Sequence, residues 1–282
     1  MEIKLLHNRD IDENRWNKTV LDSVQFNFSG CSWYLDMLDP DWQGIVDSDY
    51  TYVFPILSKT NLQNKYKLYF LWSLYSSKEV TQELFKLFAY KMKQITGMFP
   101  VNVNNLNYFK SDLFTPDGEG FKIDMLSDNK NAFYYNRKVN TTIKELIDFK
   151  YVVFEGVRNT EAVEYFCVFD NFKRSKSKKD FLKRLLSYCE YHRIGNVLTV
   201  LNPNNSVVAI SVFVRTNSKA WMYLVSFDKG IDKRGCLLLM IDFYIKKFAH
   251  LNIPLEICNS KNIEPFLEEM GFMKYIKYCV NN

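Results

Sequence analysis

The segment AWMYLVSFDKGIDKRGCLLLMIDFYIKKFAH, residues 220–250, decides the fold. Its first part, residues 220–227, is apolar and aromatic and predicts a strand. Residues 227–236 carry glycine, lysine and arginine and predict a loop, and the apolar run 237–250 predicts a helix. A strand, a basic loop with glycine and a helix can form a phosphate cradle, because the unpaired N–H groups at a helix N-terminus favour an anion.

Short strands and helices flank this segment on both sides. Before it, strands over 196–201 and 207–215 lead through turn residues into 220–227, which predicts an antiparallel meander. After it, residues 253–257 predict a strand, 263–271 a short helix that ends at Gly271, and 275–280 a final strand.

The rest of the chain alternates in the same way. Helical periodicity or capping predicts helices over residues 12–20, 32–38, 78–95, 160–172 and 179–192. Apolar runs between turn residues predict strands over 45–46, 50–57, 66–72, 100–107 and 151–157, and residues 116–120 (PDGEG) predict a turn. We expect an α/β or α+β protein with two domains, residues 1–130 and 131–282.

Composition sets limits on what the protein can be. With 282 residues, 47% hydrophobic and 24% charged, the chain is too long for a mini-protein and too apolar for disorder. The net charge of +5 is too mild to identify a nucleic-acid binder by itself. The six cysteines never approach CxxC spacing, which predicts buried thiols in a reducing compartment. No apolar leader or membrane span is apparent, so we expect a cytoplasmic protein.

The order meander, basic loop, helix, strand, short helix and strand resembles the C-terminal half of the GNAT N-acyltransferase superfamily, over residues 196–280. Scattered aromatic motifs extend the resemblance to tandem-GNAT, Fem-like (aminoacyltransferase-related) proteins of Bacteroidota: Ile11–Trp16, Ser32–Asp36, Trp42, Val46–Tyr50 and Phe54-Pro55. The resemblance implies two GNAT-like domains with mixed central sheets flanked by helices. It also implies acyl-CoA as a co-substrate, with no permanently bound cofactor.

The resemblance also implies a set of donor-binding residues. GNAT loops of the form Gln/Arg-x-x-Gly-x-Gly/Ala hold the pyrophosphate of acyl-CoA, and the best register here is Asp232-Lys-Arg-Gly-Cys-Leu237. This register keeps one glycine but has an acid in first place and leucine in last place. The donor's carbonyl is expected on the backbone N–H groups of strand 220–227. The candidate donor-binding residues are Val225, Ser226, Asp232, Lys233, Arg234, Gly235 and Cys236.

The general acid is not found where the resemblance implies it. The family often has a tyrosine four residues before the glycine of Gly271-Phe272, and that position here is Leu267. Leucine cannot donate a proton, so Tyr275, Tyr278 or water would have to supply it, or the protein is not a catalyst. Asp232 and Glu256 are candidate general bases, with a loop acid and a strand-face charge as the structural alternatives.

Other features of the sequence have structural explanations beside the functional ones. The basic stretch 173–184 could contact phosphates of tRNA, CoA or a nucleotide-linked substrate, or form a solvated loop and helix face. His7, His192 and His250 lack ligand spacing, so we expect no metal site. Cys236 lies at the start of the predicted helix but has no recognisable histidine partner, so we interpret it as a small residue that fills the loop. The aromatic residues Trp33, Tyr34, Trp42, Tyr50 and Tyr52 favour core packing over a ligand groove.

The sequence therefore predicts an N-acyltransferase that transfers an acyl or aminoacyl group from a small-molecule donor, acyl-CoA or a related compound, to an unidentified amine acceptor. A catalytically degenerate GNAT-fold binding or scaffold protein is the alternative, because the loop and Leu267 depart from the pattern. General nucleic-acid binding is a third hypothesis that rests on the basic stretch alone. The sequence does not indicate an oligomeric state.

Overall fold

A computed structural model describes residues 2–23, 26–57, 74–96, 102–103, 114–125, 135–169, 176–257 and 264–280. The chain divides into two compact units, unit 1 with Met1–Gly118 and Ile276–Asn282, and unit 2 with Glu119–Tyr275. The division falls inside β6 (Phe114–Asp124) and inside β12 (Met273–Val280). The predicted boundary near residue 130 lies outside the described residues and stays a prediction.

Unit 1 contains an antiparallel sheet in the order β1-β2-β3-β4. Its elements are β1 (Ile3–His7), η1 (Asn8–Asp10), α1 (Glu13–Asp22), η2 (Phe28–Gly30), α2 (Ser32–Leu38), β2 (Gln43–Asp47), β3 (Tyr52–Ile56), β4 (Tyr75–Ser76), α4 (Gln82–Thr96) and β5 (Asn102–Val103). The side chain of Asp12 caps α1 by accepting from the N–H groups of Asn14 and Arg15. β5 pairs antiparallel with the end of β12.

Aromatic side chains fill the core of unit 1. The rings of Trp16 and Trp42 lie 4.9 Å apart, and both side chains are buried. Each indole has a hydrogen-bond acceptor: Trp16 donates to the Gly30 carbonyl at 2.8 Å and Trp42 to Asp36 at 2.7 Å. The core-packing interpretation is confirmed for Tyr34, Trp42 and Tyr50, which are buried, whereas Trp33 and Tyr52 are half-buried.

Unit 2 is built on a mixed sheet whose strands follow the order β12-β6-β11-β10-β9-β8-β7. β7, β8, β9 and β10 form an antiparallel meander, β10 pairs parallel with β11, and β11 pairs antiparallel with β6. The elements not yet given are α5 (Arg137–Asp148), β7 (Val152–Glu155), α6 (Asn159–Phe169), α7 (Lys176–Tyr191), β8 (Gly195–Leu201), β9 (Val207–Arg215), β10 (Ala220–Phe227), α8 (Lys233–Phe248), η5 (Ala249–Leu251), β11 (Pro254–Ile257) and α9 (Glu264–Glu269).

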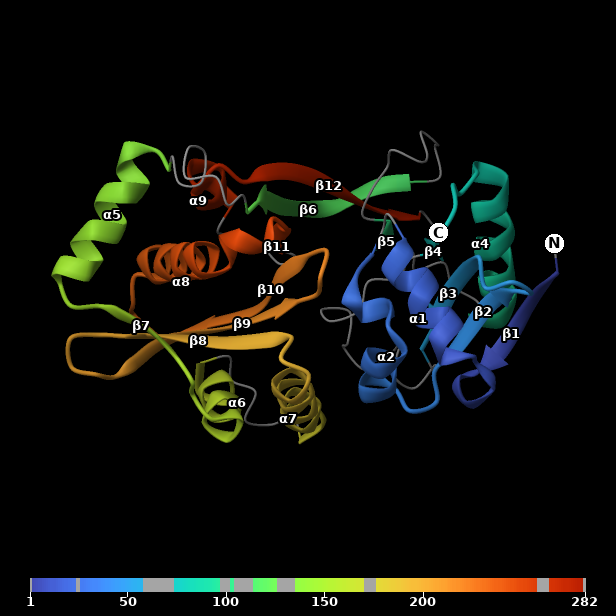
Figure 1. The fold of residues 1–282 in the computed structure, drawn as a ribbon, viewed down its shortest axis with the longest axis horizontal. Helices are drawn as coiled ribbons and strands as arrows, with labels where there is room; N and C mark the ends of the chain where they lie inside the picture. Colours follow the sequence, from blue (N-terminus) through green and yellow to red (C-terminus); the bar gives the residue numbers. More distant parts are fainter. Residues whose placement is uncertain are drawn as a thin grey trace. The chain divides into compact units, whose positions relative to one another are not determined.

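Helices cover both faces of the meander in unit 2. α8 lies on one face, and α6 and α7 lie on the other (Figure 1). α8 is buried over most of its length, which explains its almost continuous apolar sequence. Its Tyr244 stacks on Phe213 of β9 with ring centroids 4.0 Å apart, and α5 packs against α8. The α/β fold with helices around a mixed sheet is therefore confirmed in this unit.

Two sequence expectations are wrong in detail. Residues 116–120 do not form a turn but lie inside β6, because pairing within the sheet outweighs their local turn preference. Gly120 is needed there, since an added Cβ would lie 2.2 Å from the ring of Tyr275. The central helix begins at Lys233 and not at Leu237, so the loop between β10 and α8 is shorter than expected. The strand expected over 66–72 lies outside the described residues.

Candidate functional site

The ladder of β10, the strand expected to hold the donor's carbonyl, is interrupted near its middle. Ala220 to Met222 pair parallel with Leu255 to Ile257 of β11. On the β9 side the register shifts between Met222 and Leu224, which leaves Tyr223 as an extra residue. Such a β-bulge turns backbone groups out of the regular ladder. A ligand that needs backbone N–H donors would find them most readily at this point of β10.

Val225 and Ser226 follow the bulge. They lie opposite Ser211 and Ile210 of β9, so on that side their backbone is part of the ladder. Val225 is half-buried, and Ser226 is 1% exposed. The Ser226 hydroxyl has no hydrogen-bond partner among the described residues. A buried hydroxyl without a partner costs free energy unless water or a ligand supplies one.

The N-terminus of α8 is occupied by a carboxylate of the chain itself. Asp232 is the N-cap, and its Oδ1 accepts from the Arg234 N–H at 3.1 Å. The first-turn N–H groups of Lys233 and Gly235 have no acceptor within the helix. Gly235 is buried, and an anion at this end of the helix would meet the negative charge of Asp232.

Arg234 does not extend toward a ligand. Its Nη2 lies 2.5 Å from Glu269 Oε2 at the end of α9, and its guanidinium lies 4.7 Å from the ring centroid of Phe266. Lys138 of α5 joins the same carboxylate at 3.0 Å. Lys233, in contrast, is exposed and makes no ion pair among the described residues. Of the two predicted cationic residues, Lys233 is therefore the one available to a phosphate.

Gly235 and Cys236 are packing residues of the first turn of α8. A Cβ on Gly235 would lie 2.5 Å from Leu146 Cδ1 and 2.7 Å from Asp232 Oδ2, so glycine allows α5 and the cap to approach. Cys236 is 1% exposed. Burial, and to a lesser degree the charge of Asp232, raises its pKa to about 12. The thiol stays protonated at neutral pH and is no nucleophile, in agreement with its interpretation as a filler.

The candidate acid and base residues lie in different surroundings. Glu256 is 9% exposed and is held by Lys219 at 2.8 Å and by the Trp221 indole N–H at 3.2 Å. Leu267 is fully buried in the core of unit 2. The Tyr275 ring packs at Gly120 in β6. Tyr278 pairs with Val103 through the backbone of β12, in unit 1.

Comparisons with known proteins support the fold. No protein-family model matches the sequence, and no curated protein matches it. Three solved structures are similar over nearly the whole chain: FemX, with a TM-score of 0.63, 7% identity and 99% of this chain and 96% of that chain covered; L-PGS from Bacillus licheniformis, with 0.58, 12%, 95% and 90%; and a tandem GNAT protein from the clavulanic acid biosynthesis pathway, with 0.50, 10%, 98% and 98%. The chain therefore has the fold of GNAT and tandem-GNAT proteins.

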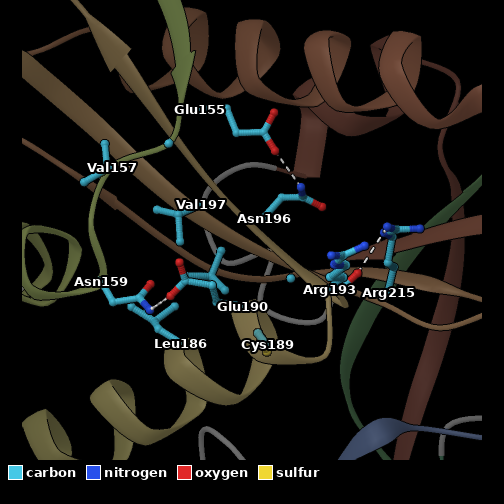
Figure 2. A pocket seen from close by; sticks show the side chains of 13 residues that line it. Glu155, Val157, Asn159, Leu186, Cys189, Glu190, Arg193, Asn196, Val197 and Arg215 are labelled. Atoms are coloured by element: carbon cyan, nitrogen blue, oxygen red, sulfur yellow. Dashed lines mark hydrogen bonds between the residues drawn. The ribbon is translucent and has the colours of Figure 1, made fainter.

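A pocket that the sequence did not predict lies elsewhere in unit 2, where β7 ends and β8 begins. Figure 2 shows its lining, which comes from β7, the start of α6, the end of α7, β8 and β9. Its volume is about 290 Å³. Arg193, Asn196 and Arg215 are among the polar residues that line it. No sequence motif marks them, because they are brought together by the meander and not by spacing.

Other features of the described residues add no site. They contain no cluster of histidine, cysteine and acidic residues arranged to hold a metal ion. None of their helices is long and apolar enough to cross a membrane. The described part of the basic stretch belongs to α7, where Lys183 and Arg184 are exposed and Phe181 and Leu182 are buried. This helix has the ordinary amphipathic pattern, and residues 173–175 lie outside the described residues.

Proposed function

We propose that this protein is an N-acyltransferase that moves an acyl or aminoacyl group from acyl-CoA, or from a related donor, to an amine. The observation that carries the proposal is the bulge at Tyr223 of β10, in the strand that leads into the N-terminus of α8. The similarity of the fold to a tandem GNAT protein and to FemX supports it. We place two GNAT-like domains at residues 1–130 and 131–282, in a cytoplasmic protein.

The reaction in this proposal needs no covalent enzyme intermediate. The donor's carbonyl oxygen accepts from backbone N–H groups of β10 beside the bulge, which stabilises the negative charge that develops during attack. The amine nitrogen forms the new C–N bond, the C–S bond of a thioester breaks, and the thiolate leaves after it receives a proton. Holding amine and donor in line supplies much of the rate.

The proton donor in this proposal is not the residue that the family resemblance implies. Leu267 has no proton to give, so the proton comes from Tyr275, Tyr278 or water. Glu256 remains a candidate base, but its carboxylate already binds Lys219 and the indole of Trp221. Deprotonation of the amine by water fits these contacts better, because it leaves the Glu256 contacts intact.

The donor's phosphates would lie at the start of α8. We assign them to Lys233 and to the first-turn N–H groups of Lys233 and Gly235. Arg234 is held by Glu269, and Asp232 repels an anion, so we expect a weaker donor site than a glycine-rich loop provides. This arrangement fits a donor that binds as a co-substrate and leaves after each turnover.

Titration calorimetry with acetyl-CoA tests the proposal. We expect micromolar binding to the wild type and binding about threefold to tenfold weaker in Lys233→Ala, since one charge-assisted contact is lost. Lys144→Ala is the matched control, because Lys144 is an exposed lysine of α5 without an ion pair among the described residues. No heat up to about 1 mM acetyl-CoA would rule out acyl-CoA as the donor.

A catalytically degenerate binding or scaffold protein is the second candidate function. The buried Leu267 and the occupied N-terminus of α8 favour it. An aminoacyl-tRNA donor is distinguished by a different measurement. tRNA contacts along α7 would weaken steeply as salt rises, because each phosphate contact releases counterions. A protein that binds neither acetyl-CoA nor tRNA would support the scaffold.

A further inference from the structure

The pocket beside the ends of β7 and β9 shares no residue with the β10–α8 segment. It lies where the edge strand β7 leaves the sheet after Glu155, while β8 continues to Gly195. The paired register ends at Glu155 opposite Leu198, so the first residues of β8 extend beyond their neighbour. This uneven end of the sheet leaves room for a pocket of about 290 Å³.

Three polar pairs surround the pocket (Figure 2). Asn196 Nδ2 donates to Glu155 Oε1 at 2.6 Å, and Asn159 Nδ2 donates to Glu190 Oε2 at 2.5 Å. In the third pair, Arg215 Nη2 donates to the Arg193 carbonyl oxygen at 3.2 Å. The apolar part of the lining includes Leu186, Val197 and Val212. An apolar floor with a few convergent polar groups is the usual make-up of a small-molecule site.

The acids of this pocket are paired, whereas its arginines have no acid partner among the described residues: Arg215 donates to the Arg193 carbonyl, and its guanidinium lies 5.0 Å from the ring centroid of Phe248. The other oxygen of Glu155 forms an ion pair with Lys247. Neither Arg193 nor Arg215 makes an ion pair with an acid among the described residues. Arg215 Nε is buried there without an acceptor. A guanidinium donor that is removed from water without an acceptor is costly, which favours an anion at this position.

The pocket suits an anion of one charge. Two arginines and two acids line it, so their formal charges balance, and a doubly charged ligand would gain less than it loses in hydration. The planar fork of arginine matches a carboxylate, and the apolar floor lies beside it. The volume is near the lower end of the range for ligand pockets, which limits the ligand to a short molecule.

We propose that this pocket binds a small organic anion, a carboxylate that carries a short apolar group. The carboxylate lies between Arg193 and Arg215, and the apolar group lies on Leu186, Val197 and Val212. Cys189 in the lining does not react with the ligand, because it is buried and stays protonated.

Isovalerate and its neutral isostere isovaleramide test the proposal on the full chain. Thermal shift and calorimetry are expected to detect isovalerate at up to about 10 mM, with isovaleramide binding at least about tenfold more weakly. Inorganic phosphate is expected to bind more weakly than isovalerate. Equal binding of acid and amide, tighter binding of phosphate, or no binding of isovalerate would each overturn the proposal.

Arg193→Asn is the test variant, because Arg193 is exposed and has a backbone φ of 56°, a region that asparagine tolerates. We expect it to keep the wild-type melting temperature without ligand and to bind isovalerate about tenfold more weakly. Lys150→Asn is the matched control, since Lys150 is exposed, has a φ of 66° and does not line the pocket. Isovalerate binding to Arg193→Asn that equals binding to Lys150→Asn would contradict the proposal.

Discussion

The start of α8 and the pocket beside β7 handle their arginines in opposite ways. Arg234 at α8 is held by Glu269 at 2.5 Å, and the helix N-terminus is capped by Asp232. Arg193 and Arg215 line the pocket without an acid partner among the described residues, although two acids lie in the same lining. The first region pairs its arginine with an acid of the chain, and the second leaves two arginines without an acid partner among the described residues.

This difference shows that a motif gives the position of a group but not its availability. The basic loop of the sequence correctly places cations at a helix N-terminus. Whether an anion can use them depends on acids that lie far along the chain, such as Glu269, which is 35 residues from Arg234. Ligand binding therefore depends on which charges remain after the fold has formed its own pairs.

The largest loss of stability is expected when the acid that pairs with Arg234 at the start of α8 is removed. Glu269→Gln leaves Arg234 half-buried without a carboxylate partner and also frees Lys138. We expect the free energy of unfolding to fall by about 2 kcal/mol, between the values for exposed and buried pairs. Urea denaturation measures it. Glu268→Gln, at an exposed neighbouring position, is the control and should change the free energy of unfolding by less than about 0.5 kcal/mol. Equal effects of the two variants would show that the pair is not stabilising.

Alkaline pH is expected to cause the next largest loss of stability, because each of the two regions contains a buried thiol. Burial raises the pKa of Cys189, which lines the pocket, from the ordinary thiol value of 9.0 to about 12. Burial also raises the pKa of Cys236 at α8. Below pH 9 both folded and unfolded states hold the proton, so the stability is fully present. Between pH 9 and about 12 only the unfolded thiol ionises, and stability is lost as pH rises.

At pH 10 the loss from Cys189 is expected to be on the order of 1 kcal/mol. The check is urea denaturation at pH 8 and pH 10 of the wild type and of Cys189→Ala. The variant should lose on the order of 1 kcal/mol less between the two pH values than the wild type does. Cys236→Ala should act in the same direction. An unchanged pH dependence in Cys189→Ala would mean that this thiol ionises freely in the folded protein.

Much of the fold could be predicted because the periodicity of the apolar residues reports burial. The pattern of α2 and of the β2–β3 hairpin matches the structure closely, since α2 has one buried face and the apolar runs of β2 and β3 are buried on both faces. Residues 116–120 were wrongly predicted to form a turn, because their glycine, proline and aspartate indicate only a local conformational preference. Their strand conformation comes from neighbours in the sheet, including the ring of Tyr275 against Gly120.

The site was harder to predict than the fold. The sequence located the β10–α8 segment and the missing acid at Leu267, since both depend on positions within one stretch. The sequence alone could not show that Asp232 caps the helix of that segment and that Glu269 pairs with its Arg234. It also could not show that Arg193 and Arg215 lie next to each other. Arg193 follows α7 and Arg215 ends β9, and only the pairing of β8 with β9 brings them together.

The smallest effect is expected at Asp232, the N-cap of α8. Asparagine caps a helix as well as aspartate does, so Asp232→Asn should change the free energy of unfolding by less than about 0.5 kcal/mol. It removes the negative charge from the N-terminus of α8, where the donor's phosphates are proposed to lie. Calorimetry should therefore show acetyl-CoA binding about threefold tighter than in the wild type. Asp228→Asn is the control, because Asp228 is an exposed acid of the same loop whose side chain, within the described part of the chain, bonds only to the neighbouring Lys229 N–H. If both variants strengthen acetyl-CoA binding equally, the gain reflects net charge, and the phosphates do not lie at the cap. A gain confined to Asp232→Asn would mean that the chain's own carboxylate competes with the donor for the end of α8.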